Sequence, residues 1–89
     1  MKVVYDPLFV KRVKRLNVRV RKNIKIRLLL FSRDPNNPEL NNHELSRKWV
    51  GYRSIDITSD YRAIFEEVEI KGDKVAYFVT IGTHKELYR

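Results

Sequence analysis

A switch in the spacing of apolar residues is the feature that most constrains how this chain can fold. Before residue 33 the apolar residues recur every three or four positions, which predicts amphipathic helices. This stripe consists of Phe9, Val13, Leu16, Val20, Ile24, Leu28 and Phe31. After residue 50 apolar and polar residues alternate instead, as around Ile55 and Ile57, which predicts strands. Between these regions, residues 33–42 (RDPNNPELNN) contain two prolines and four asparagines and are expected to form a loop.

Local signals predict where the elements begin and end. Residues 2–5 (KVVY) are rich in β-forming residues and predict a first strand. Asp6 and Pro7 are suited to cap and open a helix, and Asn17 is expected to interrupt it. A second helix follows from residue 18 to Ser32, so that two basic helices lie antiparallel. Strands are predicted at residues 51–57, 60–70 and 74–81, with a hairpin turn at 71–74 (KGDK).

The order of these elements predicts an α+β fold. We expect an antiparallel sheet of about four strands, with both N-terminal helices packed on one face (β-α-α-β-β-β). The 89 residues make a single domain, 1–89, with a core near the lower limit for folding without cross-links. The chain has no cysteine, which excludes disulfides and thiolate metal sites. None of its apolar runs, residues 28–31 among them, is long enough to span a membrane, so we expect a soluble cytoplasmic protein.

Positive charge is concentrated in the first third of the chain. Residues 1–33 contain eleven Lys or Arg and one acid, a net charge of +10, whereas residues 34–89 carry −2 of the total of +8. Such a one-sided excess favours RNA, DNA, the ribosome surface or an acidic protein as the partner. The alternative is a solvated helix face without a ligand.

Residues that could perform chemistry lie in or beside the predicted strands. Three dispersed glycines do not make a phosphate-binding loop, and two isolated histidines do not make a zinc site by their spacing. We therefore expect no metal and no cofactor. The remaining candidates are His43, Asp56, Asp60, Tyr61, Arg62, His84 and Tyr88. An antiparallel sheet can bring residue 84 beside residues 56–62, although each candidate taken singly has an ordinary structural explanation.

Two segments, NHELSRKWVGYRSIDITSDYRAIF and TIGTHKELYR, resemble the RelE/ParE superfamily of toxins from toxin–antitoxin pairs, and within it the YafQ branch. That branch shows a histidine then a leucine, Trp-x-Gly-Tyr-Arg, an Asp-aromatic pair entering a strand, and a terminal Gly-Thr-His-x-x-Leu-aromatic. The matching residues here are His43 and Leu45, Trp49–Arg53, Asp60 and Tyr61, and Gly82–His84 with Leu87 and Tyr88. The resemblance follows nearly the whole chain in element order.

This resemblance implies a ribosome-dependent endoribonuclease, an mRNA interferase that cleaves mRNA during translation. It also implies a hetero-oligomer with a cognate antitoxin that has an acidic segment and is encoded by the adjacent gene. The implied catalytic residues are His43, Asp56, Asp60, Arg62, His84 and Tyr88. We assign contacts with the ribosome or the mRNA to Tyr61, Arg53, Lys48, Arg19, Lys22 and Lys25.

Two positions bear on the mechanism. Asp56 stands where a family histidine falls, and Arg62 matches the catalytic arginine of RelE and YoeB relatives, so which group is the base stays open. We expect Asp60 or Asp56 to orient His84.

The chemistry of the residues is compatible with metal-free RNA cleavage. Histidine titrates near neutrality and can take a proton from the 2′-hydroxyl or give one to the 5′-oxygen. Arginine presents a fork to phosphate oxygens, and tyrosine rings stack on unpaired bases. Two alternatives stay open: a ParE-like toxin that inhibits DNA gyrase, and a non-cleaving member of the superfamily that only binds the ribosome.

Overall fold

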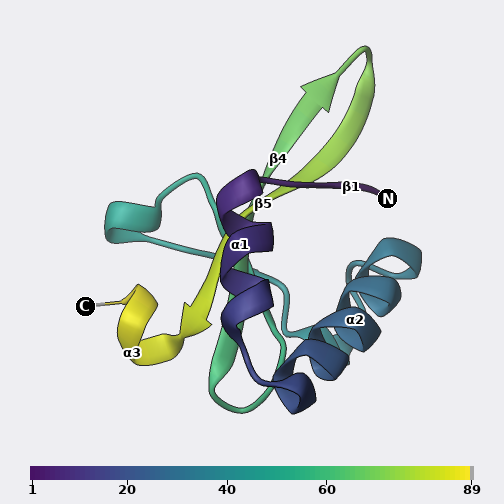
Figure 1. Cartoon of the computed structure of the whole chain (residues 1–89). Helices are drawn as coiled ribbons and strands as arrows, with labels where there is room; N and C mark the ends of the chain where they lie inside the picture. Colours follow the sequence, from purple (N-terminus) through teal and green to yellow (C-terminus); the bar gives the residue numbers. More distant parts are fainter. Residues whose placement is uncertain (89) are drawn as a thin grey trace.

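A five-stranded mixed sheet organises the computed structural model, which describes residues 1–88 (Figure 1). Its strands are β1 (Lys2–Tyr5), β2 (His43–Glu44), β3 (Arg53–Asp56), β4 (Tyr61–Ile70) and β5 (Asp73–Thr83). The helices are α1 (Pro7–Arg15), α2 (Val18–Arg33) and α3 (His84–Leu87), with two 3₁₀ turns, η1 (Pro38–Leu40) and η2 (Arg47–Trp49). The strands lie in the spatial order β1-β5-β4-β3-β2. None of the helices within residues 1–88 is both long and apolar enough to cross a membrane.

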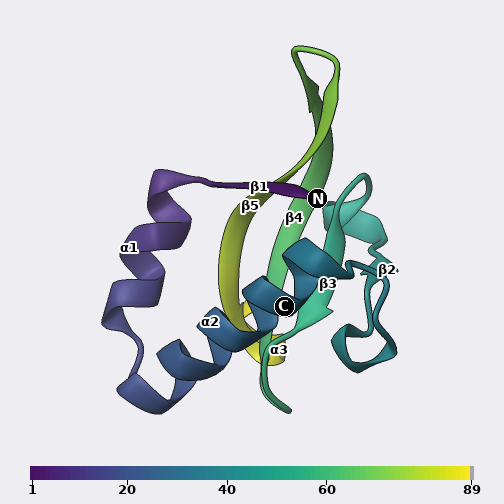
Figure 2. The same ribbon diagram turned by 90° about the vertical axis from the view of Figure 1, so that its right-hand side faces the viewer.

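Side-chain caps start both N-terminal helices, as predicted. Asp6 accepts a hydrogen bond from the backbone N–H of Leu8, and Pro7 is the first residue of α1. Asn17 accepts one from the Val20 N–H at 3.0 Å and starts α2 directly after α1 has ended. The two helices diverge from residues 16–17 in a V, rather than lying along one another (Figure 2).

Both helices cover one face of the sheet and bury their apolar stripe against it. Phe9, Val20 and Phe31 are at most 8% exposed. The Phe31 ring meets Phe65 of β4 and Phe78 of β5 edge-on, with centroids 5.0 and 5.3 Å apart. Such pairs contribute about 0.5–1.5 kcal/mol each beyond the area that they bury. The predicted α+β class, with helices on one face, is confirmed.

Two features of the sheet differ from the predicted set of about four antiparallel strands. β1 is parallel to β5, with Lys2 opposite Val75. A parallel pair needs a long connection, which the rest of the chain supplies here, and no local pattern encodes that pairing. β2 adds a fifth strand of two residues, with His43 opposite Ser54, and is too short to show alternation in the sequence. His43 therefore lies in a strand rather than in a loop.

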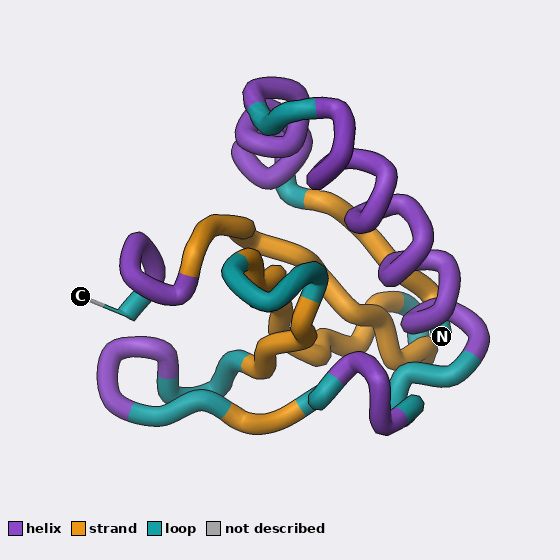
Figure 3. Tube along the Cα trace, turned by 90° about the horizontal axis from the view of Figure 1, so that it is seen from below, coloured by secondary structure: helices purple, strands orange, loops and turns teal. Residues whose placement is uncertain are grey.

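β4 and β5 form a long hairpin that projects beyond the rest of the molecule in Figure 1. The hairpin turns at Lys71 and Gly72, whose φ angles of 51° and 83° suit the two-residue turns that match strand twist. The predicted turn is thus in the right place, although Asp73 and Lys74 already belong to β5. At its other end β5 runs directly into α3, which lies on the same side of the molecule as η2 (Figure 3).

Candidate functional site

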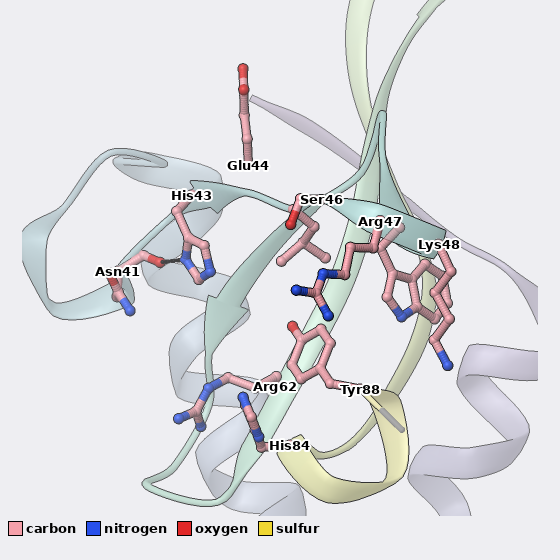
Figure 4. A pocket seen from close by; sticks show the side chains of 11 residues that line it. Asn41, His43, Glu44, Ser46, Arg47, Lys48, Arg62, His84 and Tyr88 are labelled. Carbon is pink, nitrogen blue, oxygen red and sulfur yellow. Dashed lines mark hydrogen bonds between the residues drawn. The ribbon is translucent and has the colours of Figure 1, made fainter.

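A pocket of about 700 Å³ lies where β2, η2, the start of β4 and α3 meet (Figure 4). Four of the six predicted catalytic residues line it, together with the predicted substrate-binding residue Lys48; the four are His43, Arg62, His84 and Tyr88. Its remaining lining residues are Asn41, Glu44, Leu45, Ser46, Arg47 and Trp49. The chain's two histidines, 41 positions apart in the sequence, therefore share one pocket.

His43 is presented by β2 with one ring nitrogen fixed. Its Nδ1 lies 2.7 Å from the carbonyl oxygen of Asn41. A carbonyl oxygen accepts hydrogen bonds and does not donate them, so this contact assigns the hydrogen to Nδ1. In the neutral ring Nε2 is then the proton acceptor, and His43 can act as a general base.

His84 and Tyr88 are positioned by α3. Thr83 caps the helix and forms a capping box with Glu86, which satisfies two backbone N–H groups reciprocally. The backbone N–H of His84 donates to the carbonyl oxygen of Asp60 at 3.0 Å, which ties α3 to the β3–β4 connection. The rings of His84 and Tyr88 are 4.6 Å apart between centroids and inclined by 59°. A short helix thus presents an imidazole ring beside an aromatic face.

Trp49 anchors the far end of α3. Its indole Nε1–H donates to the carbonyl oxygen of Leu87 at 2.9 Å. The last carbonyls of a helix have no partner within the helix, so this bond satisfies one of them. The Trp49 ring also packs edge-on against Tyr52, with centroids 5.5 Å apart. The Trp-x-Gly-Tyr segment therefore holds the element that carries His84.

Arg62 is held by Asp56 and by the β3–β4 connection. The two residues face each other across the strands, with Arg62 Nε 3.0 Å from Asp56 Oδ1. This contact is an ion pair rather than a hydrogen bond, because no aligned N–H reaches that buried oxygen. Arg62 Nη1 donates to the carbonyl oxygens of Thr58, Ser59 and Tyr61 at 2.9, 3.1 and 3.1 Å. Among residues 1–88 nothing holds the Nη2 amine.

Asp56 and Asp60 do not line the pocket. Asp56 faces Arg62, and its second oxygen is 3.5 Å from the Asn41 amide. The side chain of Asp60 is exposed, and the residue reaches His84 through its main-chain carbonyl instead. Neither carboxylate makes a recorded contact with the His84 ring within the described residues.

Tyr61 and Arg53 also lie outside the pocket lining. Tyr61 packs against the apolar core, on the opposite sheet face from Arg62, because neighbours in a strand alternate. Arg53 Nε donates to the Asn42 side chain at 2.9 Å, and Arg53 Nη1 is 3.5 Å from the Glu44 carboxylate.

The predicted cations of α2 lie on a different surface. Arg19, Lys22 and Lys25 are exposed, and α2 lies away from α3 and η2 in Figure 3. A second, mostly apolar groove of about 620 Å³ runs between α1, α2 and β1. Apolar residues that line this groove include Tyr5, Phe9, Val10, Val13, Leu28 and Leu29, and its cations are Lys14, Arg21 and Lys25.

One hydrogen bond outside both pockets shifts the pKa values of two side chains. Tyr77 donates its hydroxyl to Asp6 Oδ2 at 2.7 Å, where β1 leads into α1. This bond lowers the pKa of Asp6, with a further contribution from the Leu8 N–H, and raises the pKa of Tyr77. Within residues 1–88 no group of three or more His, Asp or Glu side chains is placed to hold a metal ion.

Six lining residues were not among the candidates named from the sequence, and two of these, Arg47 and Trp49, have distinctive geometry. Arg47 has a φ of 57°, in the left-handed region that favours glycine, and Figure 4 shows its side chain reaching into the pocket above Tyr88. No residue spacing signals such a backbone angle. Trp49 offered one signal, because a partly buried indole N–H requires an acceptor, but the sequence did not say which.

Comparisons with known proteins point to one family. The family model described as "Bacterial toxin of type II toxin-antitoxin system, YafQ" matches residues 1–89. The crystal structure of YafQ from E. coli strain BL21(DE3) is 25% identical, with a TM-score of 0.78 over 99% of this chain and 98% of that one. A chain of the E. coli DinJ–YafQ complex is 26% identical, with a TM-score of 0.66 over 99% and 98%.

A more distant structure shares the fold. It is the RelB–RelE antitoxin–toxin complex from Methanococcus jannaschii, with 20% identity and a TM-score of 0.67 over 96% of this chain and 94% of that one. A search among curated proteins found no match.

Proposed function

This chain belongs to the family of YafQ toxins from bacterial type II toxin–antitoxin systems, and we propose that it is a ribosome-dependent endoribonuclease that cleaves mRNA during translation. The observation that carries the proposal is the pocket in which both histidines meet an arginine and a tyrosine. Metal-free RNA cleavage requires groups that move protons, a cation beside the phosphate and a surface that holds the base.

In the proposed reaction His43 is the general base and His84 the general acid. Nε2 of His43 takes the proton of the 2′-hydroxyl as the 2′-oxygen bonds to the adjacent phosphorus. The Nδ1 contact with Asn41 supports this role, since it leaves Nε2 unprotonated in the neutral ring. Protonated His84 gives its proton to the 5′-oxygen as the phosphorus–oxygen bond breaks. The products are a 2′,3′-cyclic phosphate and a 5′-hydroxyl.

Arg62 and Tyr88 complete the proposed site. Arg62 is always cationic, and its Nη2 amine is available to a phosphate oxygen that gains charge in the transition state. Asp56 acts through Arg62, whose guanidinium it holds at 3.0 Å. Tyr88 offers a face on which a base beside the scissile bond stacks. Asp60 contributes by fixing the start of α3 through its carbonyl oxygen.

The substitution His84→Ala tests this function. Removing a proton-transfer group is expected to slow cleavage of ribosome-bound mRNA by about 10²–10⁴-fold, with the melting temperature and ribosome affinity close to those of the wild type. Lys85→Ala is the matched control, because Lys85 is exposed on the same helix and does not line the pocket. A fully active His84→Ala variant would remove this residue from the mechanism.

The two alternative functions give different readouts after induction of the wild-type protein. An mRNA interferase creates new mRNA 5′ ends. A gyrase inhibitor changes DNA supercoiling without creating such ends, and a non-cleaving ribosome binder lowers bulk translation alone. The convergence of His43 and His84 on one pocket favours the first outcome.

We also propose a cognate antitoxin, encoded by the adjacent gene, as the partner that silences the protein. The E. coli relative has been crystallised as a DinJ–YafQ complex. On this chain the apolar groove between α1, α2 and β1, with its three cations, fits an amphipathic segment that carries acidic residues. Co-expression with the adjacent gene should yield a stable complex and restore growth. Harmless expression of the chain alone would contradict the toxin function.

The ribosome is the second proposed partner, in the cytoplasm. The exposed cations of α2 supply contacts to ribosomal RNA phosphates that do not depend on base sequence.

A further inference from the structure

We propose that Arg47 is a substrate-binding residue that contacts a phosphate of the RNA in the pocket, an inference that rests on the proposed function. Arg47 lines the pocket from η2, opposite the strand that supplies Arg62. Three observations carry the proposal: the conformation of its backbone, the rigidity of its loop, and the contrast between its side chain and that of Arg62.

The backbone of Arg47 adopts a conformation that is unfavourable for a residue with a side chain. Its φ of 57° lies in the left-handed region, where the Cβ atom crowds the backbone. The same loop reaches the left-handed region again at residue 51, with a φ of 91°, and there the residue is glycine. An exposed arginine adds no core packing to offset this cost. Non-glycine residues in such conformations cluster at ligand-binding sites.

Backbone hydrogen bonds keep this loop in place. The N–H of Val50 donates to the Arg47 carbonyl at 3.1 Å, and the N–H of Trp49 donates to the Ser46 carbonyl at 3.1 Å. A bond of 2.9 Å from the Leu45 N–H to the Tyr52 carbonyl closes the base of the loop. The Trp49 indole ties the loop to α3 as well. The surroundings therefore hold Arg47 in its strained conformation and direct its side chain over the pocket.

The two pocket arginines differ in how many contacts their side chains make within the protein. Arg62 contacts Asp56 through Nε and three carbonyl oxygens through Nη1. Arg47 makes no ion pair or side-chain hydrogen bond with any residue of the described chain, and Figure 4 shows it reaching toward the centre of the pocket. Its whole guanidinium fork is available, in the geometry that binds two phosphate oxygens.

Three substitutions separate the charge of Arg47 from its backbone strain. Arg47→Gly removes both, Arg47→Ala removes the charge and keeps a Cβ in the left-handed region, and Arg47→Lys keeps a charge and the strain. Each purified variant is assayed for cleavage of mRNA on translating ribosomes, with kcat and KM determined separately, and for its melting temperature.

We expect catalysis to follow the charge and stability to follow the strain. Arg47→Gly and Arg47→Ala should lower kcat/KM by about 10- to 100-fold, as expected for the loss of a contact between charged groups. Arg47→Lys should lose less, because an ammonium group still reaches the phosphate as a point charge. The melting temperature of Arg47→Gly should equal or exceed that of the wild type, and should be the highest among the three variants.

The outcomes distinguish this inference from the proposed function. A wild-type protein that cleaves no ribosome-bound mRNA would overturn the proposed function itself. An active wild type with an equally active Arg47→Gly variant would overturn the role of Arg47 alone. A parallel loss of activity and melting temperature in Arg47→Gly would also overturn it, because the side chain would then be supporting the loop.

Discussion

Replacing Trp49 by phenylalanine tests whether one hydrogen bond secures the helix that carries His84. The bond runs from Trp49 Nε1 to the Leu87 carbonyl over 2.9 Å. Phenylalanine retains an aromatic ring against Tyr52 and lacks the donor, so the exchange removes the bond while leaving most of the apolar contact. Leu87 is only 4% exposed, so water has limited access to the carbonyl once the indole is gone.

The expected magnitude follows from that geometry. A hydrogen bond between neutral, partly buried groups contributes about 1 kcal/mol net. If the bond forms only when α3 is docked, its loss raises the undocked population about fivefold. The same free energy limits the change in global stability, because 1 kcal/mol shifts the melting temperature of a domain of this size by about 4–8 °C.

Amide hydrogen exchange measures the undocked population of α3 directly. The Tyr88 N–H donates to the His84 carbonyl at 3.0 Å and is protected only while α3 is formed. In Trp49→Phe this amide should exchange about fivefold faster, whereas amides in the centre of β4 should change no more than the global stability does. Cleavage should fall by no more than a similar factor. Tyr52→Phe is the control, because the Tyr52 hydroxyl makes no recorded hydrogen bond within the described residues and its ring contact survives.

Two results would refute this reasoning. Unchanged exchange at Tyr88 would mean that α3 stays docked without the indole bond. A uniform acceleration at Tyr88 and in β4 would mean that Trp49 supports the whole fold rather than one helix.

Three further outcomes are expected. Substituting the α2 cations Arg19, Lys22 and Lys25 together by glutamate should weaken ribosome binding and flatten its dependence on salt, measured by sedimentation across salt concentrations. Unchanged binding would mean that these residues serve only to keep the helix face solvated. Asp56→Asn should slow cleavage about 10²-fold through misplacement of Arg62, without altering the shape of the pH–rate profile. In an Arg62→Lys background the same substitution should cause little further loss of rate. Loss of one limb of the pH–rate profile would instead make Asp56 an acid–base group. Hydrogen bonds lower the pKa of Asp6 below its ordinary 3.8, so the stability that Asp6 contributes is present above that pH and is lost as the pH falls through the lower folded value. Tyr77→Phe should therefore have a lower melting temperature than the wild type at neutral pH and should lose less of it on acidification. The same pH dependence of melting in the wild type and in Tyr77→Phe would contradict this assignment.

Local chemistry made much of the fold predictable. Asp6 and Asn17 are caps whose side chains bond backbone groups two or three residues away, so a short window of sequence contains the whole interaction. The β4–β5 hairpin is equally local. The pairing of β1 with β5 could not be predicted in this way, because Lys2 and Val75 are brought together only by the complete tertiary structure.

The candidate site shows the same contrast between features that the sequence predicts and features that depend on the tertiary structure. His43, Arg62, His84 and Tyr88 were expected together on the strength of a family resemblance, and they line one pocket. Strand alternation separates Tyr61 from its neighbour Arg62, a consequence that the strand prediction already contained. The backbone angle at Arg47 was beyond prediction, because it is set by the hydrogen bonds of the loop around it rather than by neighbouring side chains.

The pairing of β1 with β5 also has a consequence for how the protein is made. Lys2 and Asp73, 71 positions apart, meet at 2.7 Å across the two strands. A ribosome delivers the chain from its first residue onward, so α1 and α2 emerge well before any sheet exists for them to cover. Pairing over such a separation is slow, and it must await the synthesis of β5. We therefore expect a nascent copy to expose its cationic helices beside the ribosome before His43 and His84 share a pocket. If the protein cleaves mRNA on ribosomes as proposed, this order of synthesis keeps the site inactive until release and leaves time for an antitoxin to bind the nascent chain.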